Sequence, residues 1–134
     1  MTSTLVDLPT LDFAGRLAGF PDAHRFALVR VAAENELLFR LSCLDIEGLE
    51  FVVAAPFPFF PAYEPEIDDN TAERLELTQA SDAVLLVVLT VGESITSTTA
   101  NLFAPIVVNI KTRRAAQVVL TGSDYSLREP LLRG

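Results

Sequence analysis

The sequence predicts an all-β fold, an antiparallel, barrel-like domain of short strands with one short helix near residues 71–77. Eight prolines and six glycines divide the chain into intervals that mostly fall short of the roughly ten residues a helix needs. These intervals are rich in Val, Leu, Ile, Phe and Thr, and turn residues recur about every 8–12 residues, which is typical of barrels and sandwiches. The length of 134 residues fits one domain, spanning residues 1–134.

The first half of the chain contains three predicted strands: Phe26–Val31, Leu37–Cys43 and Phe51–Ala55. A polar turn at residues 34–36 separates the first two. Because side chains alternate between the two faces of a strand, Leu37–Cys43 places Phe39, Leu41 and Cys43 on one apolar face, which makes Cys43 a small core residue. The third strand stops at Pro56, which has no N–H to donate to a sheet.

The second half contains four more predicted strands: Asp82–Gly92, Thr98–Phe103, Ile106–Ile110 and Ala116–Thr121. Asp82–Gly92 is apolar on both faces, so we expect it to be a central strand that is covered on both sides. One segment between the two halves has the pattern of a helix start. Asn70 is an N-cap candidate and Glu73 follows it at the spacing of a capping box, which predicts about two turns of helix over Thr71–Leu77.

The composition excludes several classes of function. A net charge of −8 argues against DNA or RNA as a direct ligand, because phosphate binding needs a basic surface. The longest apolar run, Ala83–Val91, is shorter than the roughly 17–25 residues of a membrane-spanning helix. The N-terminus lacks a signal peptide, and Cys43 is the single cysteine, so we expect a cytoplasmic protein without a membrane anchor.

No catalytic motif is present, so we expect no enzyme activity, no catalytic residue and no cofactor. The sequence lacks G-x-S-x-G, H-E-x-x-H, Walker A and G-x-G-x-x-G patterns. The acidic stretch at residues 64–69 lacks the central Gly and terminal Glu of a calcium loop, so no metal site is predicted there. A small-ligand or cation-binding barrel, with this stretch as a weak site, remains the alternative class.

The acidic residues are unevenly distributed. Residues 45–76, the acidic segment, carry nine acids and one base, so their charge of −8 equals that of the whole chain. The segment is either a solvated face or part of a binding patch, because it brackets an unusual loop of aromatic residues and prolines at 56–63. The candidate partner-binding residues here are Phe57, Phe59, Phe60, Tyr63, Glu64, Glu66, Asp68 and Asp69.

Several motifs together resemble the flagellar assembly factor FliW family. The most specific is Asn101-Leu-Phe-Ala-Pro-Ile-Val-Val-Asn109, and the resemblance runs from about Phe13 to Leu131. Shorter matching stretches are Phe13-Ala-Gly15, Leu17-Ala-Gly-Phe20, Leu41-Ser-Cys-Leu-Asp45, Phe51-Val-Val, Phe60-Pro-Ala-Tyr63, Gln117-Val-Val-Leu120, Tyr125 and Arg128.

The resemblance implies a single FliW-like β-barrel domain, a cytoplasmic monomer when free, that works by binding rather than by catalysis. Family members bind flagellin before its export and bind the RNA-binding translational repressor CsrA. Free FliW keeps CsrA away from the flagellin message, and newly made flagellin removes FliW from CsrA. Within the family motif, Asn101 and Asn109 are either partner contacts or, in the favoured interpretation, residues whose amides hold backbone groups around Pro105.

Overall fold

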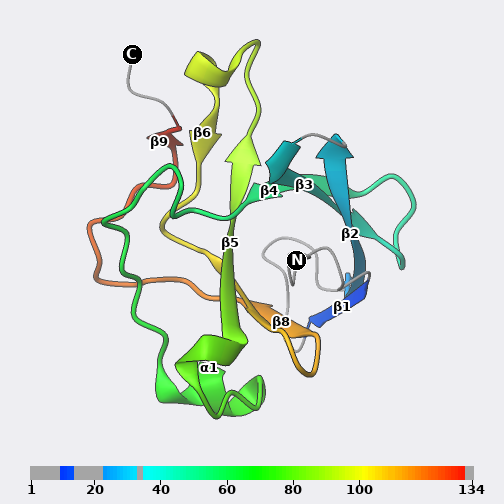
Figure 1. The fold of residues 1–134 in the computed structure, drawn as a ribbon, viewed down its shortest axis with the longest axis vertical. Helices are drawn as coiled ribbons and strands as arrows, with labels where there is room; N and C mark the ends of the chain where they lie inside the picture. The colour runs from blue at the N-terminus through cyan, green and yellow to red at the C-terminus, as the bar shows by residue number, and fades with distance from the viewer. Residues whose placement is uncertain (1–9, 14–22, 33–34, 132–134) are drawn as a thin grey trace.

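The computed structural model describes residues 10–13, 23–32 and 35–131 (Figure 1). One α-helix, α1 (Asp69–Arg74), and two 3-10 turns, η2 (Ala80–Asp82) and η3 (Ile95–Ser97), accompany the strands in this part of the chain. The strands are β1 (Thr10–Phe13), β2 (Arg25–Ala32), β3 (Asn35–Cys43), β4 (Glu50–Ala54), β5 (Ala83–Thr90), β6 (Thr99–Ala100), β7 (Ile106–Asn109), β8 (Arg114–Gln117) and β9 (Glu129–Pro130).

The strands close into a barrel. The order along the sheet is β4-β3-β2-β1-β8-β7-β5-β6-β9, and an additional pairing of β4 with β5 closes a ring of seven strands. Figure 1 looks down on this ring, with β6 and β9 continuing beyond it. The predicted all-β barrel with one short helix is therefore confirmed. One pairing departs from the antiparallel pattern, because β1 runs parallel to β8, with Asp12 opposite Arg114 and Phe13 opposite Ala115.

Strand positions agree best where the apolar pattern is long. Both ends of β2, β3, β4, β5 and β7 fall within two residues of the predicted positions. β8 lies at Arg114–Gln117 instead of Ala116–Thr121, and the strand predicted at Thr98–Phe103 is reduced to β6. β1 and β9 were not predicted, because four and two residues carry no readable alternation. The motif at residues 15–20 and the first residue of the polar turn at 34–36 lie outside the described residues.

The barrel interior holds the largest apolar cluster. Phe13 and Phe26 meet edge to face inside it, with ring centroids 5.1 Å apart. Cys43 is half-buried against this cluster instead of being a buried core residue, and its Sγ accepts the Ile46 N–H at 3.3 Å. The buried members of the cluster are Leu11, Phe13, Ala23, Phe26, Leu28, Phe39, Leu41, Val53, Leu86, Ile106, Val108 and Ala115.

Helix α1 covers the outside of the barrel. Its C-cap residue Leu75 is fully buried with Val107 of β7 and Ala116 of β8. The N-cap is Asp68 and not Asn70, because the Asp68 carboxylate accepts the Thr71 N–H at 3.3 Å. Hydrogen bonding by the Thr71 side chain, and to a smaller extent by this Thr71 N–H, lowers the pKa of Asp68. The predicted end at Leu77 is also wrong, since Glu76 takes a left-handed φ of 58° that no helix continues.

Candidate partner-binding site

The loop at residues 56–63 is folded into consecutive tight turns. The Pro56 carbonyl accepts the N–H groups of both Phe59 and Phe60, and the Phe60 carbonyl accepts the Tyr63 N–H. Pro56 itself is fully buried and fixes the start of the loop. Because proline has one fixed backbone dihedral, the three prolines of this loop reduce the freedom that its rings lose when they bind a partner.

The four aromatic rings of this loop have different environments. Tyr63 is 3% exposed, and its hydroxyl donates a 2.6 Å hydrogen bond to the Leu102 carbonyl, so it is a core residue. Phe57 is 46% exposed, with its ring centroid 6.4 Å from that of Tyr63. Phe59 and Phe60 are half-buried. The loop therefore combines one core ring with three rings that reach the surface.

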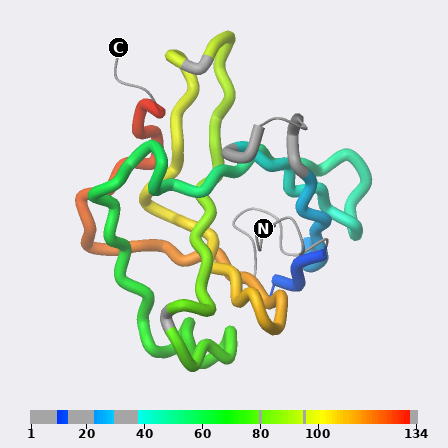
Figure 2. Tube along the Cα trace, viewed as in Figure 1, coloured from blue at the N-terminus to red at the C-terminus, as the bar shows by residue number. Residues whose placement is uncertain are grey.

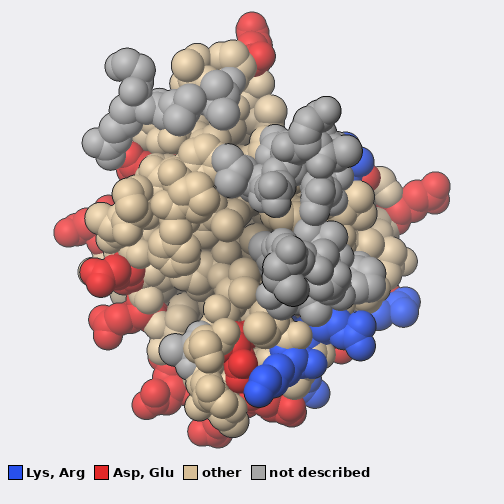
Figure 3. Space-filling view, in the orientation of Figure 1, with Lys and Arg blue, Asp and Glu red and all other residues tan. Residues whose placement is uncertain are grey.

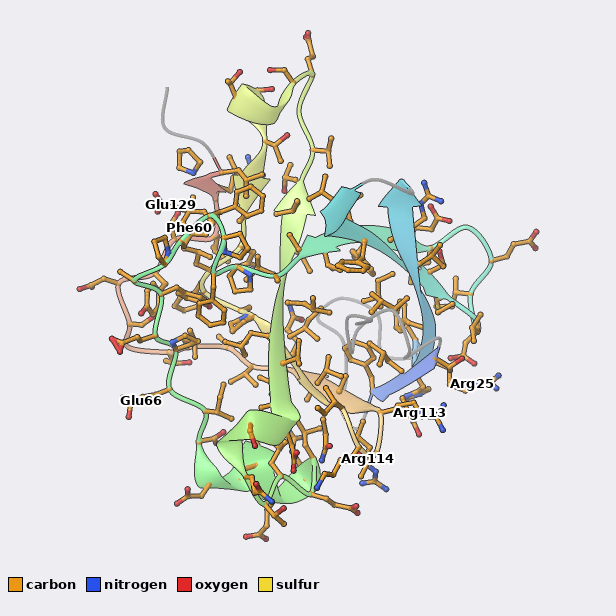
Figure 4. The ribbon with its side chains drawn as sticks, viewed as in Figure 1. Arg25, Phe60, Glu66, Arg113, Arg114 and Glu129 are labelled. Carbon is orange, nitrogen blue, oxygen red and sulfur yellow. The ribbon has the colours of Figure 1, made fainter. Side chains whose placement is uncertain are left out.

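A shallow groove of about 400 Å³, which we call the aromatic groove, lies beside this loop. Figure 4 shows Phe60 and Glu129 at its rim, contributed by segments far apart in the sequence. Tyr125 reaches into the same region and stacks edge to face on Tyr63, with ring centroids 4.8 Å apart. The groove is lined by Phe59, Phe60, Pro61, Ala62, Tyr63, Leu102, Tyr125 and Glu129.

The hydroxyl of Tyr63 provides a direct test of its core position. Burial raises the pKa of Tyr63, so its neutral form stabilises the fold fully below the unfolded-state value of 10.0 and less as pH rises above that value. We expect Tyr63→Phe to lower the free energy of unfolding by about 1 kcal/mol at pH 8, through loss of the hydrogen bond to Leu102. Urea unfolding at pH 8 and pH 11 should show the wild type losing more stability between the two pH values than the variant. Equal losses would contradict a buried hydroxyl.

The acidic segment does not form one surface. Asp45 and Glu50 lie on one side of the barrel, where they contact Arg25 at 3.4 Å and Arg40 at 3.5 Å. Backbone N–H groups of Arg25 and His24 lower the pKa of Asp45. Residues 64–76 follow the opposite side and the base of the molecule, as the separate teal and green stretches of Figure 2 show. The idea of a single −8 patch is therefore corrected to two acidic regions.

The second of these regions borders a larger groove of about 660 Å³, which we call the acidic groove. Its walls are the carboxylates of residues 64, 66 and 68 with α1 on one side, and the chain after β8 on the other. Asp69 is exposed on α1 but does not line it. The lining residues are Glu64, Glu66, Asp68, Thr71, Arg74, Gln117, Val118, Val119, Leu120, Thr121, Gly122, Ser123 and Tyr125.

Several basic residues gather on one side of the molecule, whereas Arg74 lines the acidic groove. Figure 3 shows Lys and Arg side chains grouped at the lower right and carboxylates around the left and lower rim. Figure 4 labels Arg25, Arg113 and Arg114 in that basic region. Lys111 pairs with Asp82 at 3.5 Å, and Arg114 pairs with Glu76 at 3.7 Å. In this view the basic side chains are concentrated on one side of the surface, while carboxylates are spread around the rim.

The two asparagines of the family motif hold backbone groups. Asn101 is half-buried, and its Oδ1 accepts the N–H groups of Phe103 and Ala104 at 3.1 and 3.0 Å. Asn109 is 2% exposed, and its Nδ2 donates to the carbonyls of Leu75 and Glu76. Asn101 thus holds backbone groups next to Pro105, as the favoured interpretation expects, whereas the backbone groups that Asn109 holds lie at residues 75–76 and 111–112. A partner contact of Asn101 stays a prediction.

Four features of the site were absent from the candidate residues. Leu102, Tyr125 and Glu129 line the aromatic groove, and the stretch 117–123 lines the acidic groove. The available signal was the family resemblance, because Leu102, residues 117–120 and Tyr125 all lie in matching stretches without an assigned role as groove residues. The others follow from the way in which the chain after β7 folds back on itself.

The described residues include neither a cluster of side chains that could hold a metal ion nor a helix that could cross a membrane. Within the described residues, no three His, Cys, Asp or Glu side chains are grouped so that they could hold a metal ion. No helix in that same part of the chain has the length and apolarity to cross a membrane. The chain does have two adjoining surface grooves, and Tyr125 lines both of them.

These observations define a class: small, closed β-barrels that carry open grooves on the outside of the barrel. The family model for FliW protein matches residues 3–131. The chain is 40% identical over 119 residues to the flagellar assembly factor FliW of Geobacillus sp. strain WCH70, covering 89% of this chain and 81% of the relative. The chain belongs to the FliW family.

Two further comparisons agree. The flagellar assembly factor FliW of Anoxybacillus flavithermus is 38% identical over 130 residues, which cover 97% of this chain and 88% of the relative. A crystal structure of the flagellar assembly factor FliW superimposes with a TM-score of 0.87 at 36% identity, covering 94% of this chain and 87% of the solved one. These names describe an assembly factor and not an enzyme.

Proposed function

We propose that this protein is a cytoplasmic, non-enzymatic flagellar assembly factor that binds flagellin and, as a free monomer, antagonises the translational repressor CsrA by protein–protein binding. Membership of the FliW family supports the general role. The structural observation that carries the two-partner proposal is the pair of adjoining grooves, one apolar and one acidic, that share Tyr125. A ligand that fills one groove would crowd the other, which suits a switch between partners.

The aromatic groove suits flagellin. Flagellin's terminal segments are helical in the filament and apolar on one side, so the unassembled subunit needs a cover for that side. Phe59, Phe60 and Leu102 provide an apolar floor and wall for such a helix. Phe57 projects beside them with nearly half of its surface exposed. Aromatic anchors on a rigid loop are the residues that most often dominate the binding energy of an interface.

The acidic groove suits CsrA. A protein that binds RNA presents basic side chains where it meets phosphates. Glu64, Glu66 and Asp68 line the groove and Asp69 is exposed next to it, while Arg74 is the one base among the lining residues. Such a surface attracts a basic partner at long range, and once bound it repels RNA phosphates from the neighbourhood.

Replacing Glu64, Glu66, Asp68 and Asp69 together by Gln or Asn should weaken CsrA binding by about tenfold at low salt. The physical reason is the loss of charge complementarity, and wild-type binding should itself weaken steeply as salt rises, since exposed charges are screened beyond about 8 Å at physiological ionic strength. Titration calorimetry with the cognate CsrA at 50 and 300 mM salt measures both effects. Asn at position 68 keeps a side-chain oxygen for the helix cap, so the fold should be preserved.

A matched control removes the same number of charges elsewhere. Asp12, Glu47, Glu50 and Glu93 are all exposed and lie outside both grooves. Their amide variant should bind CsrA nearly as well as the wild type. Unchanged binding in the first variant, or equal weakening in both, would reduce the acidic groove to a solvated face. Flagellin should be captured by the wild type and by both variants, because the proposal places flagellin on the aromatic groove.

A further inference from the structure

The chain after β8 presents an unpaired backbone edge. The Val118 N–H donates to the Pro105 carbonyl, and the Leu120 N–H donates to the Phe103 carbonyl. In an extended chain the backbone groups of successive residues point to opposite edges, so those of Val119 point away from residues 103–105. The edge ends at Thr121, where a turn begins in which the Leu120 carbonyl accepts the Ser123 N–H. Among the described residues, none forms a hydrogen bond with the backbone N–H or C=O of Val119 or Thr121. Val119 is also 54% exposed.

This edge borders the acidic groove. Residues 117–123 line the groove and residues 103–105 do not, so the groove lies on the side to which Val119 directs its free N–H and C=O groups. Figure 1 shows the two stretches that form its walls, the green chain leading into α1 and the orange chain that follows β8. One wall of the groove is thus a backbone edge with free hydrogen-bonding groups, and the opposite wall is a row of carboxylates.

The carboxylates of the opposite wall have the spacing of a strand. Glu64, Glu66 and Asp68 line the groove at alternate positions, while Ile67 packs inward against the Leu75 cluster. In an extended chain, alternate residues are about 6–7 Å apart. Side chains on one face of a bound strand have the same separation. Three basic side chains at alternate positions of an extended ligand therefore match the three carboxylates one to one.

We infer that the acidic groove binds an extended, basic polypeptide segment, which adds as a strand to the backbone edge at Val119 and pairs alternate Lys or Arg side chains with Glu64, Glu66 and Asp68. Strand addition obtains its affinity from main-chain hydrogen bonds and its selectivity from alternate side chains. Charge complementarity selects a basic occupant. The inference rests on the proposed function in one respect, namely that a protein partner uses the acidic groove.

Model peptides test this inference without CsrA or flagellin. The probe is the capped heptapeptide TKVKVKT, whose lysines alternate, and the reference is the capped peptide TVKKKVT of identical composition. Fluorescence anisotropy of labelled peptide against the full chain at 50 mM salt should show the alternating peptide binding at least tenfold more tightly. A version of it that is N-methylated at alternate backbone amides should lose that advantage, because a methylated amide donates no hydrogen bond.

Protein variants test the edge and the carboxylates separately. Val119→Pro removes the outward N–H and should weaken the alternating peptide by about tenfold, whereas Val119→Thr keeps the N–H and should bind like the wild type. Thermal melting of Val119→Pro checks that the variant is folded. The N-methylated peptide tests the main-chain hydrogen bonds on the wild-type protein, without any substitution. The triple variant Glu64→Gln, Glu66→Gln, Asp68→Asn should abolish the preference for alternating lysines.

Four results would overturn the inference. Equal affinity for the two heptapeptides would show a general attraction of positive charge, without strand geometry. Full binding of the N-methylated peptide would show that main-chain hydrogen bonds to the Val119 edge do not contribute to binding. Self-association of the wild type that disappears in the triple variant would assign the groove to a second copy, through a basic turn such as Lys111–Arg114. Failure of the peptides together with salt-sensitive CsrA binding would refute strand addition and leave the proposed function standing.

Discussion

Replacing Phe57 by Ala is expected to weaken flagellin binding by about 2 kcal/mol, roughly 30-fold, while leaving the free energy of unfolding nearly unchanged. Phe57 is the most exposed ring of the loop at 56–63, so its removal leaves little cavity in the fold. The Tyr63 ring lies beside it, with ring centroids 6.4 Å apart, and its contact restricts the Phe57 side chain before binding, which lowers the entropic cost of contact. Calorimetric titration with flagellin and urea unfolding of the same preparation measure the two quantities.

Tyr63→Ala, in the same loop, is expected to have the opposite effect and to lower mainly the free energy of unfolding. Removal of this buried ring should cost about 3–5 kcal/mol of folding stability, because it leaves a cavity between Leu102 and Tyr125 and deprives the Leu102 carbonyl of its donor. If Phe57→Ala lost stability and kept its flagellin affinity, the loop would be a packing element, and the flagellin surface would have to be sought elsewhere on the barrel.

Asn109→Ala is expected to lower the free energy of unfolding by about 3 kcal/mol, since each buried polar group left without a partner costs roughly 1–3 kcal/mol. The Asn109 amide links two segments that are remote in sequence. Its Nδ2 donates to the carbonyls of Leu75 and Glu76 at 2.7 and 3.2 Å, and its Oδ1 accepts the N–H groups of Lys111 and Thr112 at 2.8 and 3.3 Å. The substitution therefore releases both the end of α1 and the turn before β8.

Asn101→Ala is the control for this prediction. Asn101 accepts two backbone N–H groups within its own turn and is half-buried, so water can replace it in part. We expect a loss of about 1 kcal/mol. Chemical denaturation of both variants, with hydrogen exchange at residues 75–76 and 111–112, distinguishes a local from a global effect. Equal losses in the two variants would contradict the bridging role of Asn109.

The barrel was largely predictable because its main strands carry long apolar patterns and clear stops. β4 ends two residues before Pro56, as expected of a residue without an N–H. The central strand β5 is apolar on both faces and pairs with β4 on one side and β7 on the other. By contrast, β1 and β9 are too short for periodicity to reveal, and their pairing depends on partners far along the chain.

The sequence predicted which residues make up much of the site, but less of how these residues are arranged in space. The sequence identified the aromatic loop and the excess of acids, yet it could not separate Tyr63 in the core from Phe57 at the surface. That difference arises from contacts with Leu102 and Tyr125, which lie about forty to sixty residues further along the chain. Likewise, linear proximity grouped Asp45 with Glu64, whereas the barrel places them on different sides.

The parallel seam between β1 and β8 has a consequence for how the protein is made. It joins residues near position 12 to residues near position 114, about a hundred residues later. A ribosome therefore releases most of the chain before the two edges of the cylinder can meet, and until then the nascent polypeptide exposes the apolar side chains that will fill it. Contacts this distant in sequence also slow folding, because a large loop must be ordered before they form. Translation of β8 is the step that allows the cylinder to close.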